Sequence, residues 1–101
     1  MLLSADNVGL ATFEYPGVYS VHWYFKSARG RKALQLAKDM LTWLFSHTDA
    51  KAIRGLTKVN LKAARWASRQ VGMISYGVIE CKSGPHELFC MTKDEFLKGK
   101  E

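Results

Sequence analysis

The chain has 101 residues, of which 48% are hydrophobic and 24% are charged, so we expect one globular domain covering residues 1–101. No apolar run approaches the roughly 20 residues that a membrane-spanning helix requires, and the first ten residues lack the basic and apolar regions of a signal peptide. The formal net charge of +6 favours anionic partners, such as phosphorylated cofactors, nucleic acid or acidic protein surfaces.

The N-terminal third predicts a β-hairpin. Val8–Tyr15 reads VGLATFEY and is rich in strand formers. Pro16-Gly17 suits the centre of a type II turn, because proline fixes the first φ and glycine permits a positive second φ. The turn leads into a strand over Val18–Phe25. Both faces of that strand are apolar or aromatic apart from Ser20 and His22, so we place it inside the sheet.

A basic turn and an amphipathic helix follow the second strand. Four cations surround Gly30 within Lys26–Lys32, and apolar residues then recur at the spacing of a helix over about Arg29–Phe45. A helix start carries unpaired N–H groups and the positive end of the helix dipole. Three of the cations lie at this start: Arg29, Arg31 and Lys32. The turn is therefore a candidate site for a phosphate or pyrophosphate, and the alternative is a basic turn that is only solvated.

The second half of the chain predicts three strands and a helix. Ala50–Leu56 is a short strand, and a helix over about Asn60–Val71 ends at Gly72, where a left-handed residue is favoured. Met73–Cys81 and His86–Met91 then form a hairpin.

The last ten residues are polar and predict a short frayed helix or tail, and residues 1–3 can add a short strand. The order β-β-α-β-α-β-β predicts an α+β fold, an α/β sandwich with a mixed, mostly antiparallel sheet.

The second predicted helix carries a basic stripe: Lys58, Lys62, Arg65 and Arg69. Such a stripe is typical of a solvated face, and its alternative role is contact with nucleic-acid phosphates. We favour nucleic-acid binding less, because the aromatic residues look core-facing and no recognised nucleic-acid module matches the sequence.

Few residues have obvious chemical roles. Cys81, His86 and Cys90 lack a fourth ligand and the paired spacing of zinc sites, so we prefer two buried thiols and no metal. Two cysteines do not make a disulfide framework, which indicates the reducing cytosol. His22 is the most interesting titratable group, because it precedes the proposed phosphate turn. The alternative is a structural histidine whose hydrogen bonds are satisfied.

The segment from about Val18 to Glu80 resembles the core of the GNAT family of acyl-CoA N-acyltransferases. That family has a central strand, a basic glycine-containing turn, a long helix, a strand, an asparagine-led loop, a helix and a Gly-Phe pair. The matching positions here are Ser27–Ala33, Asn60 and Gly72-Met73. The combination is most similar to small GNAT-like proteins encoded by tailed phages, which implies the cytoplasm of a bacterial host.

The sequence departs from the family pattern at three points. Lys32 replaces the second glycine of the turn, and Ser68 stands where active members usually have a tyrosine that protonates the leaving thiolate. The chain also begins near the family's second strand, so the resemblance implies an N-terminally truncated fold. These departures concern the activity more than the fold.

The resemblance implies an acetyl-CoA-dependent N-acetyltransferase whose amine or protein acceptor is unknown. His22 would be the base, and Ser68 occupies the position of the acid. The implied coenzyme A site comprises Tyr24, Phe25, Arg29, Gly30, Arg31, Lys32, Ala33 and Asn60. The alternative is a non-catalytic GNAT-fold protein with a structural or host-interaction role in a phage.

We also expect a two-fold homodimer. Without the family's N-terminal elements, apolar surface would remain at the sheet edge around Val8–Tyr15, or on the helix faces that hold Trp43 and Phe45.

Overall fold

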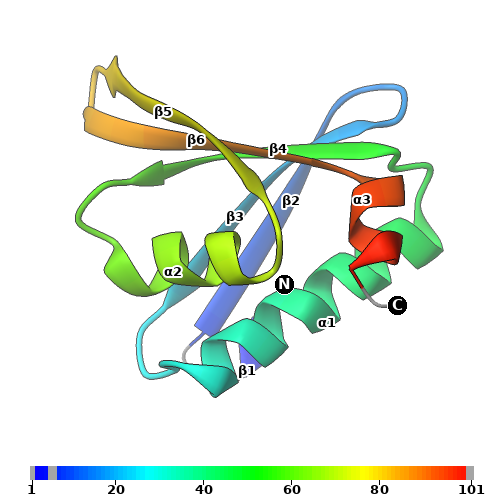
Figure 1. Cartoon of the computed structure of the whole chain (residues 1–101), viewed down its shortest axis with the longest axis horizontal. Coiled ribbons are helices and arrows are strands. Elements are labelled where there is room, and N and C mark those ends of the chain that lie inside the picture. The colour runs from blue at the N-terminus through cyan, green and yellow to red at the C-terminus, as the bar shows by residue number, and fades with distance from the viewer. Residues whose placement is uncertain (1, 5–6, 100–101) are drawn as a thin grey trace.

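The computed structural model describes residues 2–4 and 7–99, and Figure 1 shows their arrangement as one sheet with helices packed beneath it. Its elements are β1 (Leu2–Ser4), β2 (Asn7–Tyr15), β3 (Val18–Phe25), α1 (Arg31–His47), β4 (Ala52–Lys58), α2 (Lys62–Gln70), β5 (Ile74–Cys81), β6 (Gly84–Thr92) and α3 (Lys93–Lys98). None of the described helices is long and apolar enough to cross a membrane.

The strands form one mixed sheet in the order β1-β2-β3-β4-β6-β5. The β3–β4 pair is parallel, and the other four pairs are antiparallel. The predicted α+β class and mostly antiparallel sheet are confirmed. So is the central position of β3, whose bounds match the prediction.

The turns confirm two glycine predictions and correct the helix starts. Gly17 has φ 83°, as the predicted type II turn requires. Gly72 has φ 102°, and α2 ends with the Met73 amide donating to the Ser68 carbonyl at 3.0 Å, as in a Schellman motif. Helices α1 and α2 each begin two residues later than predicted, because the helical spacing of apolar side chains does not mark the point where backbone bonding starts.

The core lies between the helices and one face of the sheet. Along β3 the buried side chains alternate with exposed ones, so Val21, Trp23 and Phe25 face the core. Helix α1 buries one stripe against them: Ala33, Leu36, Ala37, Met40, Leu41, Leu44 and Phe45. Full burial of each large side chain contributes roughly 1.5–3 kcal/mol. The apolar periodicity therefore identified the correct helix face.

Phe45 corrects the predicted exposed patch on the first helix. Its ring is buried and packs on Phe96 of α3, with the centroids 5.4 Å apart. Trp43 is exposed, as predicted, and stacks on His47. Helix α3 therefore covers the side of α1 that holds Phe45, which was predicted to be exposed.

The opposite face of the sheet has no helix packed on it in the described part of the chain (Figure 1). Pairing places Val8 beside Tyr24 and Leu10 beside His22 on this face, and all four side chains are exposed. We call this surface the open face. The predicted exposed apolar residues around Val8–Tyr15 are therefore present, but they lie on a face of the sheet and not at its edge, because β1 pairs with β2.

The sheet opens between β3 and β4. Their parallel pairing covers only Val18–Ser20 and Ala52–Arg54, although β3 continues to Phe25 and β4 to Lys58. Beyond the paired residues the two strands diverge, and each presents backbone groups toward the gap. We call this gap the splay.

Gly55 sits where the strands begin to diverge, and its replacement tests how tightly they are packed. A Cβ there would lie 2.7 Å from the Val21 carbonyl oxygen, so the strand backbones would have to move apart. We predict that Gly55→Ala lowers the free energy of unfolding by about 1–3 kcal/mol in urea titrations.

Gly99→Ala is the matched control, because Gly99 has φ −65° and a Cβ there would make ordinary contacts at 3.5 Å or more. We expect its free energy of unfolding to change by less than about 1 kcal/mol. Equal losses for the two variants would show that the approach of the strands at Gly55 is not tight.

Candidate functional site

Two cavities meet at the splay. The first has a volume of about 350 Å³ and lies between the β3–α1 turn and the start of α2. The second has a volume of about 670 Å³ and opens on the open face. Both cavities are lined by Trp23, Tyr24, Asn60 and Leu61. We call these two adjoining cavities together the groove.

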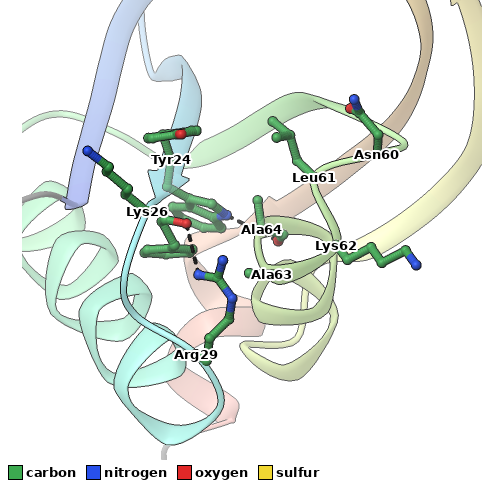
Figure 2. Close-up of a pocket in the computed structure, with 10 residues that line it drawn as sticks. Tyr24, Lys26, Arg29, Asn60, Leu61, Lys62, Ala63 and Ala64 are labelled. Carbon is green, nitrogen blue, oxygen red and sulfur yellow. Dashed lines mark hydrogen bonds between the residues drawn. The ribbon is translucent and has the colours of Figure 1, made fainter.

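The first cavity is framed by backbone and by one arginine (Figure 2). Arg29 extends from the turn and donates to the carbonyls of Phe25 at 3.0 Å and Ala28 at 2.8 Å. On the other side the Trp23 indole N–H donates to the Ala64 carbonyl at 3.3 Å. The Trp23 bond joins β3 to the first turn of α2, whereas the Arg29 bonds lie within the strand end and the turn that follows it.

The turn is also held from below by Asn7, which is 1% exposed. Its Oδ1 accepts from the amides of Ser27 and Ala28, at 3.3 Å and 3.2 Å. Sequence reasoning did not identify Asn7, because its partners lie 20 and 21 residues away. The loop conformation before α1 therefore depends on a buried amide at the start of β2.

Both helices have open N-termini: α2 begins at the groove, and α1 begins two residues after Arg29, which lines the first cavity. The residue before α1 is Gly30, with φ 54°, and the residue before α2 is Leu61. Neither start has a capping side chain, and the first turns contain no acidic residue. A Cβ on Gly30 would meet nothing within 4 Å. A phosphate could approach the start of α1 without displacing a carboxylate.

The predicted cofactor residues lie in two groups. The first group lines the first cavity: Tyr24, Phe25, Arg29 and Asn60. The second group continues the backbone from Arg29 into α1: Gly30, Arg31, Lys32 and Ala33. Ala33 is fully buried, backbone included, so the structure gives it no surface that could meet a ligand. Lys26, Lys62 and Ala63 line the same cavity and were not among the predicted site residues.

The two predicted catalytic residues lie apart. His22 is exposed and lines the second cavity. Ser68 is 2% exposed, and its hydroxyl donates to the Ala64 carbonyl at 2.9 Å within α2. Ser68 lines neither cavity. In this position its hydroxyl does not reach the groove, so the structure gives no support to an acid role.

His86 is a second histidine in the same cavity as His22. Its Nδ1 lies 2.8 Å from the Gly84 carbonyl oxygen, and a carbonyl can only accept. Nδ1 therefore carries the proton, and Nε2 is the acceptor nitrogen of the neutral ring. The sequence reading treated His86 only as a metal ligand and missed its place in the groove.

A buried carboxylate, Glu87, anchors α2 beside the groove. It is 1% exposed and accepts from Arg65 at 2.8 Å, Arg69 at 2.6 Å and Ser75 at 2.5 Å. Burial acts to raise the pKa of Glu87, but the Ser75 hydrogen bond and the two guanidinium groups hold the pKa below its usual value. Glu87 thus remains ionised near neutral pH.

Arg65 links Glu87 to the loop that lines the groove. Its guanidinium also donates to the Val59 carbonyl at 2.8 Å, immediately before Asn60 and Leu61. Two cations of the predicted basic stripe, Arg65 and Arg69, are thus bound to Glu87. The stripe is therefore only in part a free cationic surface.

The two cysteines lie at different ends of the β5–β6 hairpin. Cys81 pairs with Gly84 beside the turn, whereas Cys90 pairs with Ile74 at the far end. Burial raises the pKa of the Cys90 thiol. Among the described residues, no three acidic, histidine or cysteine side chains lie close enough together to hold a metal ion. Both cysteines are half-buried, so the prediction of two buried thiols is wrong.

No protein-family model and no curated protein matches this sequence. Three solved acetyltransferases share its fold. The aminoglycoside acetyltransferase AAC(6')-Ib, in complex with coenzyme A and kanamycin, matches with a TM-score of 0.71 and 17% identity over 87% of this chain and 54% of its own. A GNAT-family acetyltransferase from Bacillus anthracis matches with a TM-score of 0.74 and 14% identity, over 86% and 58% of the two chains.

The third is a ribosomal-protein-S5-alanine acetyltransferase from Vibrio fischeri. It matches with a TM-score of 0.68 and 12% identity, over 88% of this chain and 56% of that protein. The chain thus spans about half the length of these proteins. At such identities the likeness establishes the fold, which is that of the GNAT acetyltransferases.

Proposed function

We propose that residues 1–101 form a single GNAT-like domain that binds acetyl-CoA and transfers its acetyl group to an amine. The observation that carries the proposal is the splay, where a basic turn and an uncapped helix start adjoin the free edge of β3. The shared fold supports it, because AAC(6')-Ib with this fold has been crystallised with coenzyme A.

In this proposal the pyrophosphate lies at the start of α1. Within the predicted stretch Arg29–Ala33, the amides of Arg29, Gly30 and Arg31 would donate to its oxygens, since the Lys32 amide donates to the Arg29 carbonyl and Ala33 is buried. The positive end of the helix dipole would favour its charge. Lys32 and Arg31 are exposed beside this start and add positive potential. Gly30 leaves open space for the phosphate.

The pantetheine arm would follow the groove between β3 and the start of α2. Tyr24, Phe25 and Asn60 line its path, and the backbone of β3 beyond Ser20 is not paired with β4. Such an edge can pair with the amide groups of an extended ligand, as an added strand would. A backbone N–H at the splay would then polarise the thioester carbonyl.

The chemistry requires few protein groups. The amine nitrogen bonds to the acetyl carbonyl carbon, the C–S bond breaks, and the nitrogen loses a proton to a base. We assign that base to His22, and His86 is the alternative in the same cavity. A thiol has a pKa of about 8.5, so coenzyme A can leave as the thiolate. The reaction therefore does not require Ser68 to protonate the leaving group.

A non-catalytic role is the second candidate. The burial of Ser68 favours a non-catalytic role, because the residue at the position of the family's acid is hydrogen-bonded within α2. Such a protein would keep the cofactor groove or a binding surface in a phage structural or host-interaction role. Nucleic-acid binding has less support, since Glu87 binds Arg65 and Arg69. For either role we propose that the protein is encoded by a phage and located in the cytoplasm.

We further propose a two-fold homodimer formed through the edge strand β5. Every residue from Ile74 to Glu80 is exposed, and Glu80 is the one charged residue among them. Natural edge strands usually carry lysine or proline against association. A second copy would meet little charge repulsion here, in spite of the net charge of +6. Antiparallel pairing of two identical strands satisfies two-fold symmetry.

Coenzyme A should stabilise the folded protein, and Gly30→Glu should abolish that effect. The added carboxylate would fill the open space before α1 and repel a phosphate. We predict a dose-dependent rise of the melting temperature for the wild type with coenzyme A or acetyl-CoA, and none for the variant.

Gly77→Glu is the matched control, since Gly77 also has a positive φ and open space but lies in β5, away from the start of α1. Its coenzyme A shift, measured against its own ligand-free protein, should equal that of the wild type. A wild type without any shift at millimolar coenzyme A would refute the cofactor proposal.

His22→Gln should slow acetyl transfer while leaving coenzyme A affinity unchanged. Loss of a general base typically lowers kcat by roughly 10²-fold or more, whereas His22 does not line the first cavity. Thiol release from acetyl-CoA with an accepted amine measures kcat, and calorimetry measures affinity. His86→Gln is the comparison variant. If kcat falls more in His86→Gln than in His22→Gln, His86 is the base and the assignment to His22 is wrong.

Light scattering at tens of micromolar should give twice the chain mass of 11.4 kDa. Val78→Lys places a charge on the proposed β5 interface, so it should return the mass to that of one chain. A monomeric wild type would contradict the dimer, and a dimeric variant would place its interface elsewhere.

A further inference from the structure

We infer that the second cavity accepts an amine carried on an uncharged or anionic, largely apolar body, and disfavours polycations. The inference rests on the proposed acetyl transfer and names its acceptor class. It follows from the side chains that the cavity presents. Its described lining contains no acidic residue: Val8, Leu10, His22, Trp23, Tyr24, Leu56, Thr57, Lys58, Asn60, Leu61, Cys81, Ser83 and His86.

The wall on the side of β2 and β3 is apolar and continuous. Val8 pairs with Tyr24, and Leu10 pairs with His22, so these side chains form one patch on the open face. Val8 is 41% exposed, and Leu10 and Tyr24 are each 53% exposed. Leu56 of β4 lines the opposite wall. An apolar or aromatic group seated there would remove this surface from water.

The cavity has three basic side chains, and its other polar residues, Thr57, Asn60 and Ser83, are uncharged. Lys58 of β4 pairs with His86 of β6, and both side chains line the cavity together with His22. A polycation would place its extra charges beside Lys58, on a chain whose net charge is already +6. A carboxylate on the acceptor would instead find an ionic partner in Lys58.

The acidic residue Glu14 on this face is already bound. Glu14 lies in an adjoining cavity of about 290 Å³ that shares His22 and Leu56 with the second cavity. Its carboxylate accepts from the Ser20 hydroxyl and the Arg54 guanidinium. Glu14 also acts on the neighbouring His22 electrostatically, but its ion pair with Arg54 offsets the charge of this carboxylate.

A set of amines that differ in charge and apolar body tests the inference. The amines are 2-phenylethylamine, phenylalanine, spermidine and kanamycin, assayed at equal concentration with acetyl-CoA. We expect at least one aromatic amine to have a kcat/KM tenfold or more above both polycations. A polycation that is acetylated as efficiently as the aromatic amines would overturn the inference.

Two charge variants locate the selectivity. Lys58→Glu should lower the ratio of aromatic amine to spermidine kcat/KM by about tenfold, because it puts an acid in the cavity wall. Lys38→Glu makes the same charge change on an exposed position of α1 that lines neither cavity, so its ratio should match the wild type. An equal change in both variants would attribute the selectivity to net charge alone and overturn the assignment.

Amine binding without turnover separates this inference from the proposed function. Ligand-observed NMR with each amine, in the absence of acetyl-CoA, reports on the cavity alone. Preferential binding of the aromatic amines supports the inference even if coenzyme A does not bind, a result that would remove the transferase proposal. Preferential binding of spermidine or kanamycin overturns the inference even if coenzyme A binds.

Discussion

The structure depends on the short parallel pairing between β3 and β4. Hydrogen bonding ends after Ser20 and Arg54, although both strands continue for several residues. An edge inside a sheet is normally filled by its neighbour, since unpaired backbone groups in a buried position are costly. Here the first turn of α2 lies beside the opening, where the Trp23 indole donates to the Ala64 carbonyl. The gap is therefore part of the packed structure of the core.

Rigid supports hold each wall of the groove. On one side Asn7 binds the backbone of the β3–α1 turn, and on the other Glu87 binds Arg65, which binds the loop before Asn60. Buried carboxylates with several donors keep their charge and geometry. The free edge of β3 and the start of α1 thus hold fixed positions before a ligand arrives, which reduces the ordering cost of binding.

The sequence predicted the local features well. Strand bounds at Val18–Phe25, the glycine turn at Gly17 and the helix end at Gly72 follow from short-range chemistry, and the structure confirms each. Features set by contacts between distant residues were missed. The Arg65–Glu87 pair spans 22 residues, so the basic stripe looked free, and the burial of Ser68 depends on how α2 packs. His86 gained a place in the groove only through the pairing of β4 with β6.

The central claim is that coenzyme A lies in the splay, and an amide NMR titration tests it most directly. Coenzyme A should shift the amide resonances of Gly30–Ala33 and of His22–Phe25, with saturation at a single affinity, while the amides of β5 stay unchanged. Shifts confined to other parts of the chain, or absent at millimolar ligand, would contradict the account, whatever the fold shares with known acetyltransferases.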